Sequence, residues 1–175
     1  MSALIDKARR GASSAEGGTV NKRRKTILVA EDDPCTRHII CEIIHDAGHS
    51  VDSAKDGLEA LAHLERQRYD VLVTDYHMPR LNGLYLLTIS RALWPRLPVV
   101  MVSVEQGHPP SAAIRQGAYA WLSKPYQADQ LLKTIERAVT NAPALHGAFE
   151  GGPNPYTTGD IQAISERRSA HDRAT

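Results

Sequence analysis

The chain lacks any apolar stretch approaching the roughly 20 residues that a membrane-spanning helix needs. Its first residues also lack the apolar run of a secretory signal. Cysteine is scarce, with two among 175 residues. Cys35 and Cys41 fall in one expected helix, about 9 Å apart along its axis and on different faces, which argues against a disulfide. We therefore expect a cytoplasmic protein that neither enters a membrane nor relies on disulfides.

An excess of charge of one sign is also missing, because the formal net charge is only +1. This balance is uneven along the chain: residues 1–25 carry seven basic and two acidic residues, a net of +5, which leaves −4 for the rest. The basic run at 22–25 has no interleaved aromatic residue, as is common in disordered leaders. We do not expect direct nucleic-acid binding. Binding that falls steeply with salt and is lost without residues 1–25 would instead indicate a nucleic-acid adaptor that uses this basic segment.

The composition divides the chain into three parts. Residues 1–25 are rich in glycine, serine and alanine without apolar periodicity, which predicts a disordered basic leader. Residues 26–141 carry the regular patterning of one domain. Residues 142–175 are rich in glycine and proline, and so short a segment cannot build an independent core, so we expect no output domain.

Between 26 and 141, short apolar runs alternate five times with amphipathic segments, which indicates an α/β fold with a parallel sheet. The expected strands are 26–31, 49–53, 70–75, 97–103 and 119–123. The expected helices are 35–47, 56–67, 84–94, 109–116 and 127–141. The first, third and fourth strands are the most apolar and should be central, whereas the second alternates and should lie nearer an edge.

The first expected helix has an apolar stripe and an opposite polar stripe. At about 100° per residue, one side carries Ile39, Ile40, Ile43, Ile44 and Ala47. The other side carries His38, Cys41 and His45, which we expect in solvent. Three ligands strung along about 10 Å of helix cannot close one tetrahedral metal site alone, so a polar helix face is the better interpretation.

Polar residues follow four of the five apolar runs. They are Asp32 and Asp33, Asp75, Ser103 and Lys124. The carboxyl ends of parallel strands meet at one edge of a sheet, where such folds bind ligands, so these side chains should share one pocket. Each residue taken singly could be a helix cap or an ordinary surface group, but four coincident strand ends argue for a site.

Three neighbouring aspartates would repel one another and raise at least one pKa unless a cation holds them ionised. Mg²⁺ prefers oxygen ligands and is commonly held by one or two carboxylates together with a phosphate oxygen. The adjacent Asp32 and Asp33 form a natural metal-holding pair, which leaves Asp75 as the candidate nucleophile toward a phosphoryl group. Lys124 and Ser103 would bind the phosphoryl oxygens of the resulting acyl phosphate.

The strings at 27–33, 75–83, 102–103 and 122–125 together resemble a response-regulator receiver domain of the chemotaxis-regulator type. The resemblance covers about 26–141, and the intervals of 42, 28 and 21 residues that separate Asp33, Asp75, Ser103 and Lys124 make it specific. It implies a flavodoxin-like, doubly wound five-stranded sheet of order 2-1-3-4-5 with helices on both faces. It also implies a single-domain response regulator of a two-component system.

In such a domain Asp75 would accept a phosphoryl group from a phosphohistidine of a sensor histidine kinase or histidine phosphotransfer protein. The resemblance implies Mg²⁺ held by Asp33, Asp75 and the backbone carbonyl of His77, with Asp32 acting through water. Lys124 would pair with the acyl phosphate, and the Lys124–Pro125 peptide bond would be cis.

The resemblance also implies a switch. Ser103 would move to the phosphoryl oxygen, and Trp121, where the family more often has tyrosine or phenylalanine, would turn inward. This would change the surface of the fourth helix, fifth strand and fifth helix for a downstream protein target or phosphorelay, in a monomer or a phosphorylation-dependent dimer. His77 and Glu105 stand where the family tunes hydrolysis of the acyl phosphate.

Two other functions fit parts of the pattern. A pseudo-receiver would bind partners without phosphorylation, but the complete set of Asp, Ser and Lys residues argues against it. A haloacid-dehalogenase-like phosphatase also uses an aspartyl nucleophile and Mg²⁺, but that family has a second aspartate two residues after the nucleophile, where this chain has His77.

Overall fold

A computed structural model describes residues 23–104 and 110–141, in which five strands alternate with five helices. The strands are β1 (Thr26–Ala30), β2 (Ser50–Ala54), β3 (Val71–Asp75), β4 (Val99–Ser103) and β5 (Ala120–Ser123). The helices are α1 (Pro34–Asp46), α2 (Gly57–Arg66), α3 (Gly83–Leu93), α4 (Pro110–Arg115) and α5 (Ala128–Asn141). Each boundary lies within two residues of the one expected from the sequence.

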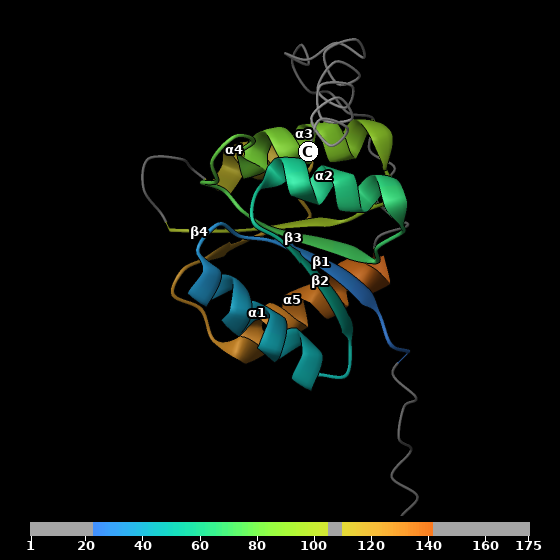
Figure 1. Cartoon of the computed structure of the whole chain (residues 1–175), viewed down its shortest axis with the longest axis vertical. Helices are drawn as coiled ribbons and strands as arrows, with labels where there is room; N and C mark the ends of the chain where they lie inside the picture. Colours follow the sequence, from blue (N-terminus) through green and yellow to red (C-terminus); the bar gives the residue numbers. More distant parts are fainter. Residues whose placement is uncertain (1–22, 105–109, 142–175) are drawn as a thin grey trace, which may run out of the picture.

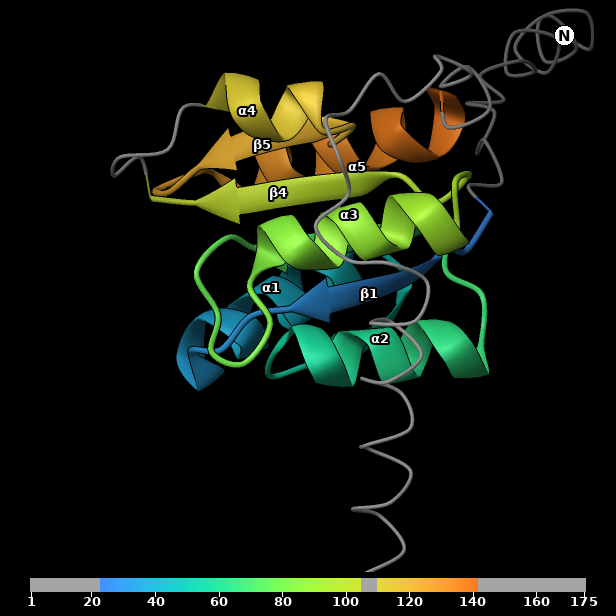
Figure 2. The ribbon, with the colours of Figure 1, turned by 90° about the horizontal axis from the view of Figure 1, so that it is seen from above.

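The sheet has the order β2-β1-β3-β4-β5, and every neighbouring pair is parallel. Helices α1 and α5 cover one face, and α2, α3 and α4 cover the other (Figures 1 and 2). The α/β fold class, the doubly wound flavodoxin-like topology and the strand order are therefore confirmed. The most apolar strands, β1, β3 and β4, are central. The edge strand β2 is the one in which apolar and polar residues alternate, as expected.

Two hydrophobic cores hold these layers together, one on each face of the sheet. Side chains of β1, β3 and β4 that point to the α1 and α5 face pack with Ile40, Ile44, Leu131 and Ile135. The opposite side chains of the same strands pack with residues of α2 and α3, including Leu61, Leu86 and Ile89. A strand that is buried on both faces is held firmly, and this fixes where its carboxyl end lies.

The orientation expected for α1 was partly wrong. Ile39 is 57% exposed, whereas Cys41, expected in solvent, is half-buried against the core. The buried residues of α1 are Ile40 and Ile44, which face the sheet. Cys41 is about 60° from Ile44 around the helix, whereas Ile39 is about 140° away, so the sulfur faces the sheet edge and the isoleucine faces solvent. Both cysteines are free thiols, as expected.

Three helices begin with a side-chain cap at the edge of the sheet where the strands end. Asp33, Asp56 and Asn82 each accept a hydrogen bond from the backbone N–H three residues later. Asp56 is also buried and forms an ion pair with Arg80, which ties the β3–α3 loop to the start of α2. The caps therefore shape the loops around the carboxyl ends of the strands.

The start of α3 lies directly against the end of β3. A side chain at Gly83 would overlap the backbone carbonyl of Asp75, and the Gly83 N–H donates to the Tyr76 carbonyl at 3.0 Å. This close approach fixes the backbone that carries Asp75. Across residues 23–104 and 110–141, no helix combines the length and apolar character that crossing a bilayer requires.

Candidate functional site

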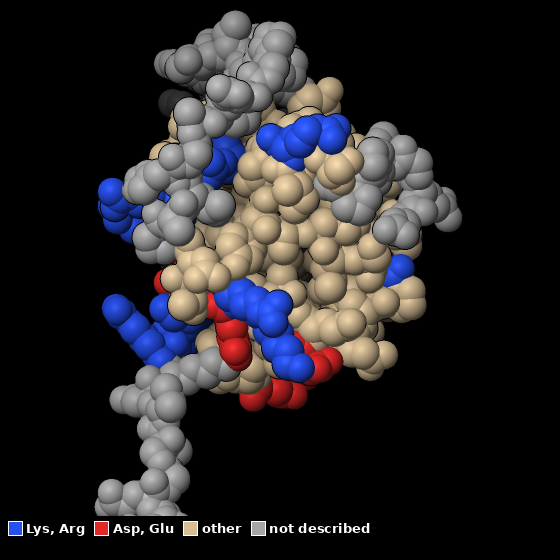
Figure 3. Space-filling model, turned by 180° about the vertical axis from the view of Figure 1, so that it is seen from behind, with Lys and Arg blue, Asp and Glu red and all other residues tan. Residues whose placement is uncertain are grey.

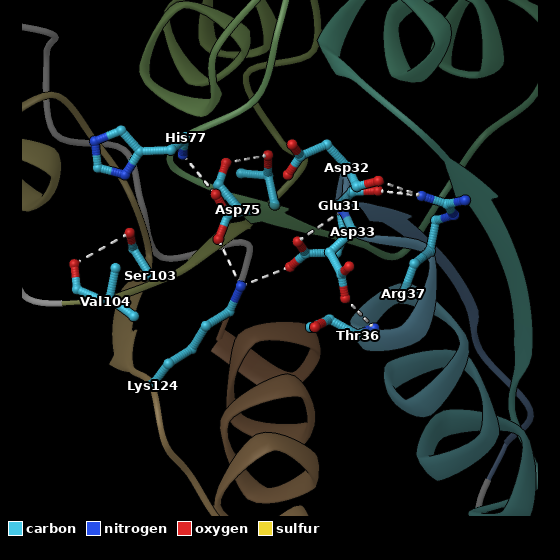
Figure 4. A network of polar contacts seen from close by, with 11 residues as sticks. Glu31, Asp32, Asp33, Thr36, Arg37, Asp75, His77, Ser103, Val104 and Lys124 are labelled. Carbon is cyan, nitrogen blue, oxygen red and sulfur yellow. Dashed lines mark hydrogen bonds and ion pairs between the residues drawn. The ribbon is translucent and has the colours of Figure 1, made fainter.

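Four strand ends converge at one edge of the sheet, the edge toward which the strand arrowheads point in Figure 2. The strongest contact between the expected site residues joins β3 to the end of β5. The Lys124 Nζ lies 2.7 Å from Asp75 Oδ1, although 49 residues separate them in the sequence. The shared-edge geometry expected from the sequence therefore brings the candidate nucleophile and the candidate phosphate-binding cation into contact (Figure 4).

Asp75 is a buried residue whose carboxylate and backbone are both held by hydrogen bonds. It is only 7% exposed, and Lys124 occupies Oδ1. Its Oδ2 accepts the backbone N–H of His77 at 2.5 Å. The Thr74 hydroxyl donates to the Asp75 backbone carbonyl at 3.0 Å, which fixes the end of the strand. The carboxylate is thus oriented toward the edge where the loops after β1, β4 and β5 meet.

Glu31 is the main member of this site that the sequence reasoning missed. Its side chain is 3% exposed, and Oε2 lies 2.7 Å from Lys124 Nζ, so the ammonium bridges two buried carboxylates. Glu31 stands directly before Asp32 and Asp33 at the end of β1. The run of three successive carboxylates was the signal available in the sequence, but only the packing shows that the Glu31 side chain points inward.

Burial and charge act in opposite directions within this cluster. Burial raises the pKa of Glu31, the nearby charge of Asp75 adds to the rise, and the Lys124 hydrogen bond offsets only part of it. Burial alone would lower the pKa of Lys124, but hydrogen bonds and charge from Asp75 and Glu31 outweigh burial and raise it. The ammonium therefore stays protonated between its two partners.

Asp32 and Asp33 lie at the rim of the site and are both exposed. Asp33 Oδ1 accepts the Thr36 N–H at 2.7 Å. Hydrogen bonds from the Thr36 side chain and then from its backbone lower the pKa of Asp33. Arg37 holds the loop by donating to the backbone carbonyls of Glu31 and Asp32. Beside these exposed aspartates, Glu31 is a carboxyl whose pKa is raised by burial.

The donor atoms at this edge suit magnesium. Among residues 23–104 and 110–141, no three His, Cys, Asp or Glu side chains form a ready metal cage. Mg²⁺ does not need one, because it keeps several waters and takes one or two carboxylates together with other oxygen atoms. Asp33, Asp75 and the His77 carbonyl supply such oxygen atoms, with the exposed Asp32 beside them.

The side chains of Ser103 and His77 are directed elsewhere than the Asp75 carboxylate. The Ser103 hydroxyl is buried and donates to the Val104 carbonyl at 3.3 Å, a long bond. The His77 ring is exposed, points away from Asp75 in Figure 4 and packs edge-on against Tyr76 with ring centroids 4.7 Å apart. Glu105 lies outside the residues that the structure describes.

Trp121 lies beside the site and is partly buried. Its ring is 5.8 Å from that of Tyr76 at 57°, and it packs against the core on the α2 and α3 face. Its indole Nε1 is buried and makes no hydrogen bond within the described part of the chain. The Lys124–Pro125 peptide bond, which begins three residues later, is cis.

Comparison with known proteins agrees with this geometry. Residues 27–136 match the family described as "Response regulator receiver domain". The nitrogen assimilation regulatory protein NtrX of Azorhizobium caulinodans is 37% identical over 119 residues, which are 65% of this chain and 26% of that protein. The chain therefore spans about a quarter of the length of the curated relatives that it matches.

Solved structures share the fold. A response-regulator receiver-domain protein from Clostridium thermocellum has a TM-score of 0.65 and 27% identity, covering 69% of this chain and 98% of that one. The receiver domain of NtrX from Brucella abortus has a TM-score of 0.63 and 36% identity, covering 65% and 98%. Receiver domains are the phosphoacceptor signalling domains of two-component systems and act with histidine kinases and downstream targets. This chain belongs to the receiver-domain family of bacterial response regulators.

Proposed function

We propose that Asp75 accepts a phosphoryl group from a phosphohistidine on a sensor histidine kinase or histidine phosphotransfer protein in the cytoplasm. The observation that carries the proposal is the buried carboxylate of Asp75 at the sheet edge, 2.7 Å from the Lys124 ammonium. A structural ion pair alone would not need the three flanking carboxylates Glu31, Asp32 and Asp33 at the same edge. That arrangement is the one phosphoryl transfer requires.

In the transfer, a carboxylate oxygen of Asp75 forms a bond to phosphorus while the bond from phosphorus to the histidine nitrogen breaks. The electron pair of that bond stays on the imidazole, which takes up a proton. Lys124 is already placed at Oδ1 and neutralises charge on the phosphoryl oxygens, while Glu31 keeps the ammonium aligned from its other side. The product is an acyl phosphate on Asp75.

The residues that would hold Mg²⁺ are Asp33, Asp75 and the His77 backbone carbonyl, with Asp32 acting through water. When bound, the ion would add further positive charge next to the phosphoryl oxygens. Asp33 can contribute its second carboxylate oxygen while Oδ1 remains the cap of α1. His77 contributes through its backbone, because its N–H already orients Asp75 Oδ2.

Phosphorylation would change the surface of α4, β5 and α5. The Ser103 hydroxyl bond to the Val104 carbonyl is long at 3.3 Å, so the hydroxyl can exchange it for a stronger, charge-assisted bond to a phosphoryl oxygen. Movement of β4 would then release or repack Trp121 beside it. The altered surface would bind a downstream protein or pass the phosphoryl group along a relay, in a monomer or a phosphorylation-dependent dimer.

His77 and Glu105 would set how long the acyl phosphate lasts, by orienting or screening the attacking water. The position of His77 supports this assignment, because its backbone N–H bonds to Asp75 Oδ2 and its ring is exposed to solvent. Dephosphorylation rates of a His77→Ala, Glu105→Ala double variant test it. We expect the rate to change, and an unchanged rate would remove both residues from this role.

Intact mass after incubation with Mg²⁺ and a small-molecule phosphodonor tests the phosphoacceptor proposal. We expect one phosphoryl adduct on the wild-type chain and none on Asp75→Asn, which keeps the shape of the side chain but not its nucleophilic oxygen. Thermal unfolding of both proteins shows that each is folded. A folded wild-type protein that takes up no phosphoryl group from any donor would overturn the proposal and favour a pseudo-receiver.

A further inference from the structure

A pocket of about 580 Å³ lies at the end of the sheet opposite Asp75, where the strands begin. It is formed by the last turn of α2 with the loop to β3, and by the loop between α3 and β4. Its volume falls within the range of about 300–1,000 Å³ that small-molecule sites occupy. The phosphoacceptor chemistry uses none of its residues.

The walls of this pocket are fixed by hydrogen bonds. The Tyr69 hydroxyl donates to Asp52 Oδ2 at 2.8 Å and lies 3.2 Å from His63 Nδ1. Burial, above all, raises the pKa of Tyr69 to about 12, so its hydroxyl stays protonated and keeps donating. The ring of Tyr69 thus forms a fixed wall rather than a mobile side chain.

The facing loop is equally well held. The Trp94 backbone N–H donates to the Ser90 carbonyl at 2.7 Å, and the Trp94 carbonyl accepts the Leu97 N–H at 2.9 Å. Arg91 donates to the Pro95 carbonyl at 2.9 Å. Trp94 packs partly against the core while it lines the pocket. A ligand would therefore meet a preformed aromatic surface and lose little binding energy to ordering the loop.

Positive charge gathers around this aromatic surface. Arg66, Arg68 and Arg96 line the pocket and are exposed, and Glu65 is the one carboxylate in its lining, which leaves a net of +2. Within the described part of the chain, these three arginines have no ion-pair partner, unlike Arg80 with Asp56. Figure 3 shows several basic side chains on the left of the domain, the side where the strands begin in that view.

We propose that this pocket, lined by Trp94, Tyr69 and the three arginines, binds a nucleotide, with phosphates on the guanidinium groups and the base against Trp94. Arginine binds phosphate oxygens through two parallel hydrogen bonds, and any nucleobase can stack on an aromatic ring. An acidic peptide would use the arginines but has no need of a rigid tryptophan wall inside a pocket of this size. The combination of anion-binding groups and ring therefore favours a nucleotide.

Tryptophan fluorescence and calorimetry of the full chain with ATP and GTP test the proposal. The chain has two tryptophans, and Trp121 in β5 packs beside Tyr76 rather than in this pocket, so Trp94→Phe isolates the signal. We expect saturable binding by at least one nucleotide, with quenching that Trp94→Phe removes. Adenosine and inorganic pyrophosphate should each bind at least about tenfold more weakly, because each lacks one half of the contact.

Arg68→Ala and Arg96→Ala are the informative variants, because both residues lie in loops outside helices and strands. Each should weaken nucleotide binding by about tenfold. Arg115→Ala and Arg137→Ala, exposed arginines of α4 and α5, are matched controls and should leave binding unchanged. Thermal unfolding of every variant checks that the fold is kept.

Asp75→Asn separates this proposal from the phosphoacceptor function, because it should abolish phosphorylation without changing nucleotide affinity. The nucleotide proposal fails if no nucleotide binds, or if binding survives both pocket arginine variants. It also fails if pyrophosphate binds as tightly as ATP, which would indicate a simple anion site, or if only an acidic peptide binds.

Discussion

Lys124 is the residue whose surroundings do most to define the site. Its ammonium lies 2.7 Å from a carboxylate oxygen on each of two buried side chains, Glu31 and Asp75. Removing the ammonium would leave two like charges in a poorly solvated place, and breaking a buried ion pair is far costlier than breaking an exposed one. The cluster is therefore both a part of the chemistry and a constraint on the fold.

Lys124→Met should lower the free energy of unfolding at neutral pH by about 2 kcal/mol and reduce phosphorylation. Urea unfolding and phosphodonor labelling measure the two effects. Adding Glu31→Gln removes one of the two stranded charges and should restore about half of the lost stability. Lys133→Met, which breaks an exposed pair with Asp129, should cost less than about 0.5 kcal/mol. Equal costs for Lys124→Met and Lys133→Met would contradict this account.

The raised pKa of Glu31 predicts a pH dependence with a defined sign. Because burial raises the folded-state pKa above its ordinary value of 4.5, the stability that Glu31 contributes is present below that value. It is lost as the pH rises through the raised pKa. The difference in unfolding free energy, wild type minus Glu31→Gln, should therefore decrease as the pH rises from below 4.5 toward neutral. Urea unfolding across this range measures it, and a flat difference would show that Glu31 titrates normally.

At the scale of the elements, the sequence predicted more of the fold than of the site. The apolar runs of β1, β3 and β4 predicted that these strands are central, and the polar residues at the strand ends predicted the functional edge. The inward direction of Glu31 and the rotation of α1, which exposes Ile39 and half-buries Cys41, were not predictable in the same way. Both depend on small rotations against neighbouring elements, and periodicity alone specifies a helix face only to within about one residue.

Asp33, at the start of α1, caps the helix and is also a proposed Mg²⁺ ligand, and one pair of variants can separate these two roles. Asparagine caps a helix about as well as aspartate, whereas alanine does not. Asp33→Asn should therefore keep the stability of the fold but weaken magnesium-dependent phosphorylation. Asp33→Ala should weaken phosphorylation and also lower the unfolding free energy, because the cap of α1 is lost.

Thermal unfolding and labelling rates at several Mg²⁺ concentrations measure the two effects of the Asp33 variants. Asp129→Asn, at an exposed acidic residue in the first turn of α5, serves as a control for the loss of a negative charge at a helix start away from Asp75. If Asp33→Asn is phosphorylated at the wild-type rate at every Mg²⁺ concentration, Asp33 acts only as the cap of α1 and does not hold the ion.

At the scale of the whole molecule, the fold separates two ends of one sheet. The carboxyl ends of the strands carry Asp75 and Lys124, and the opposite ends carry the pocket lined by Trp94 and Tyr69. The two hydrophobic cores span the distance between these ends, because β1, β3 and β4 contribute side chains to both. Within residues 23–104 and 110–141, the contacts that position Asp75 come from the elements between β1 and α5.

A fragment of residues 23–141 should therefore fold and take up the phosphoryl group like the full chain. All five strands, both cores and the Glu31–Lys124–Asp75 cluster lie within it. Thermal unfolding should give a midpoint within a few degrees of that of the full chain, which corresponds to less than about 1 kcal/mol. Labelling with a small-molecule phosphodonor should proceed at an unchanged rate, because no residue of the proposed transfer is removed. A fragment that folds but labels much more slowly would place part of the phosphoacceptor machinery in residues 1–22 or 142–175.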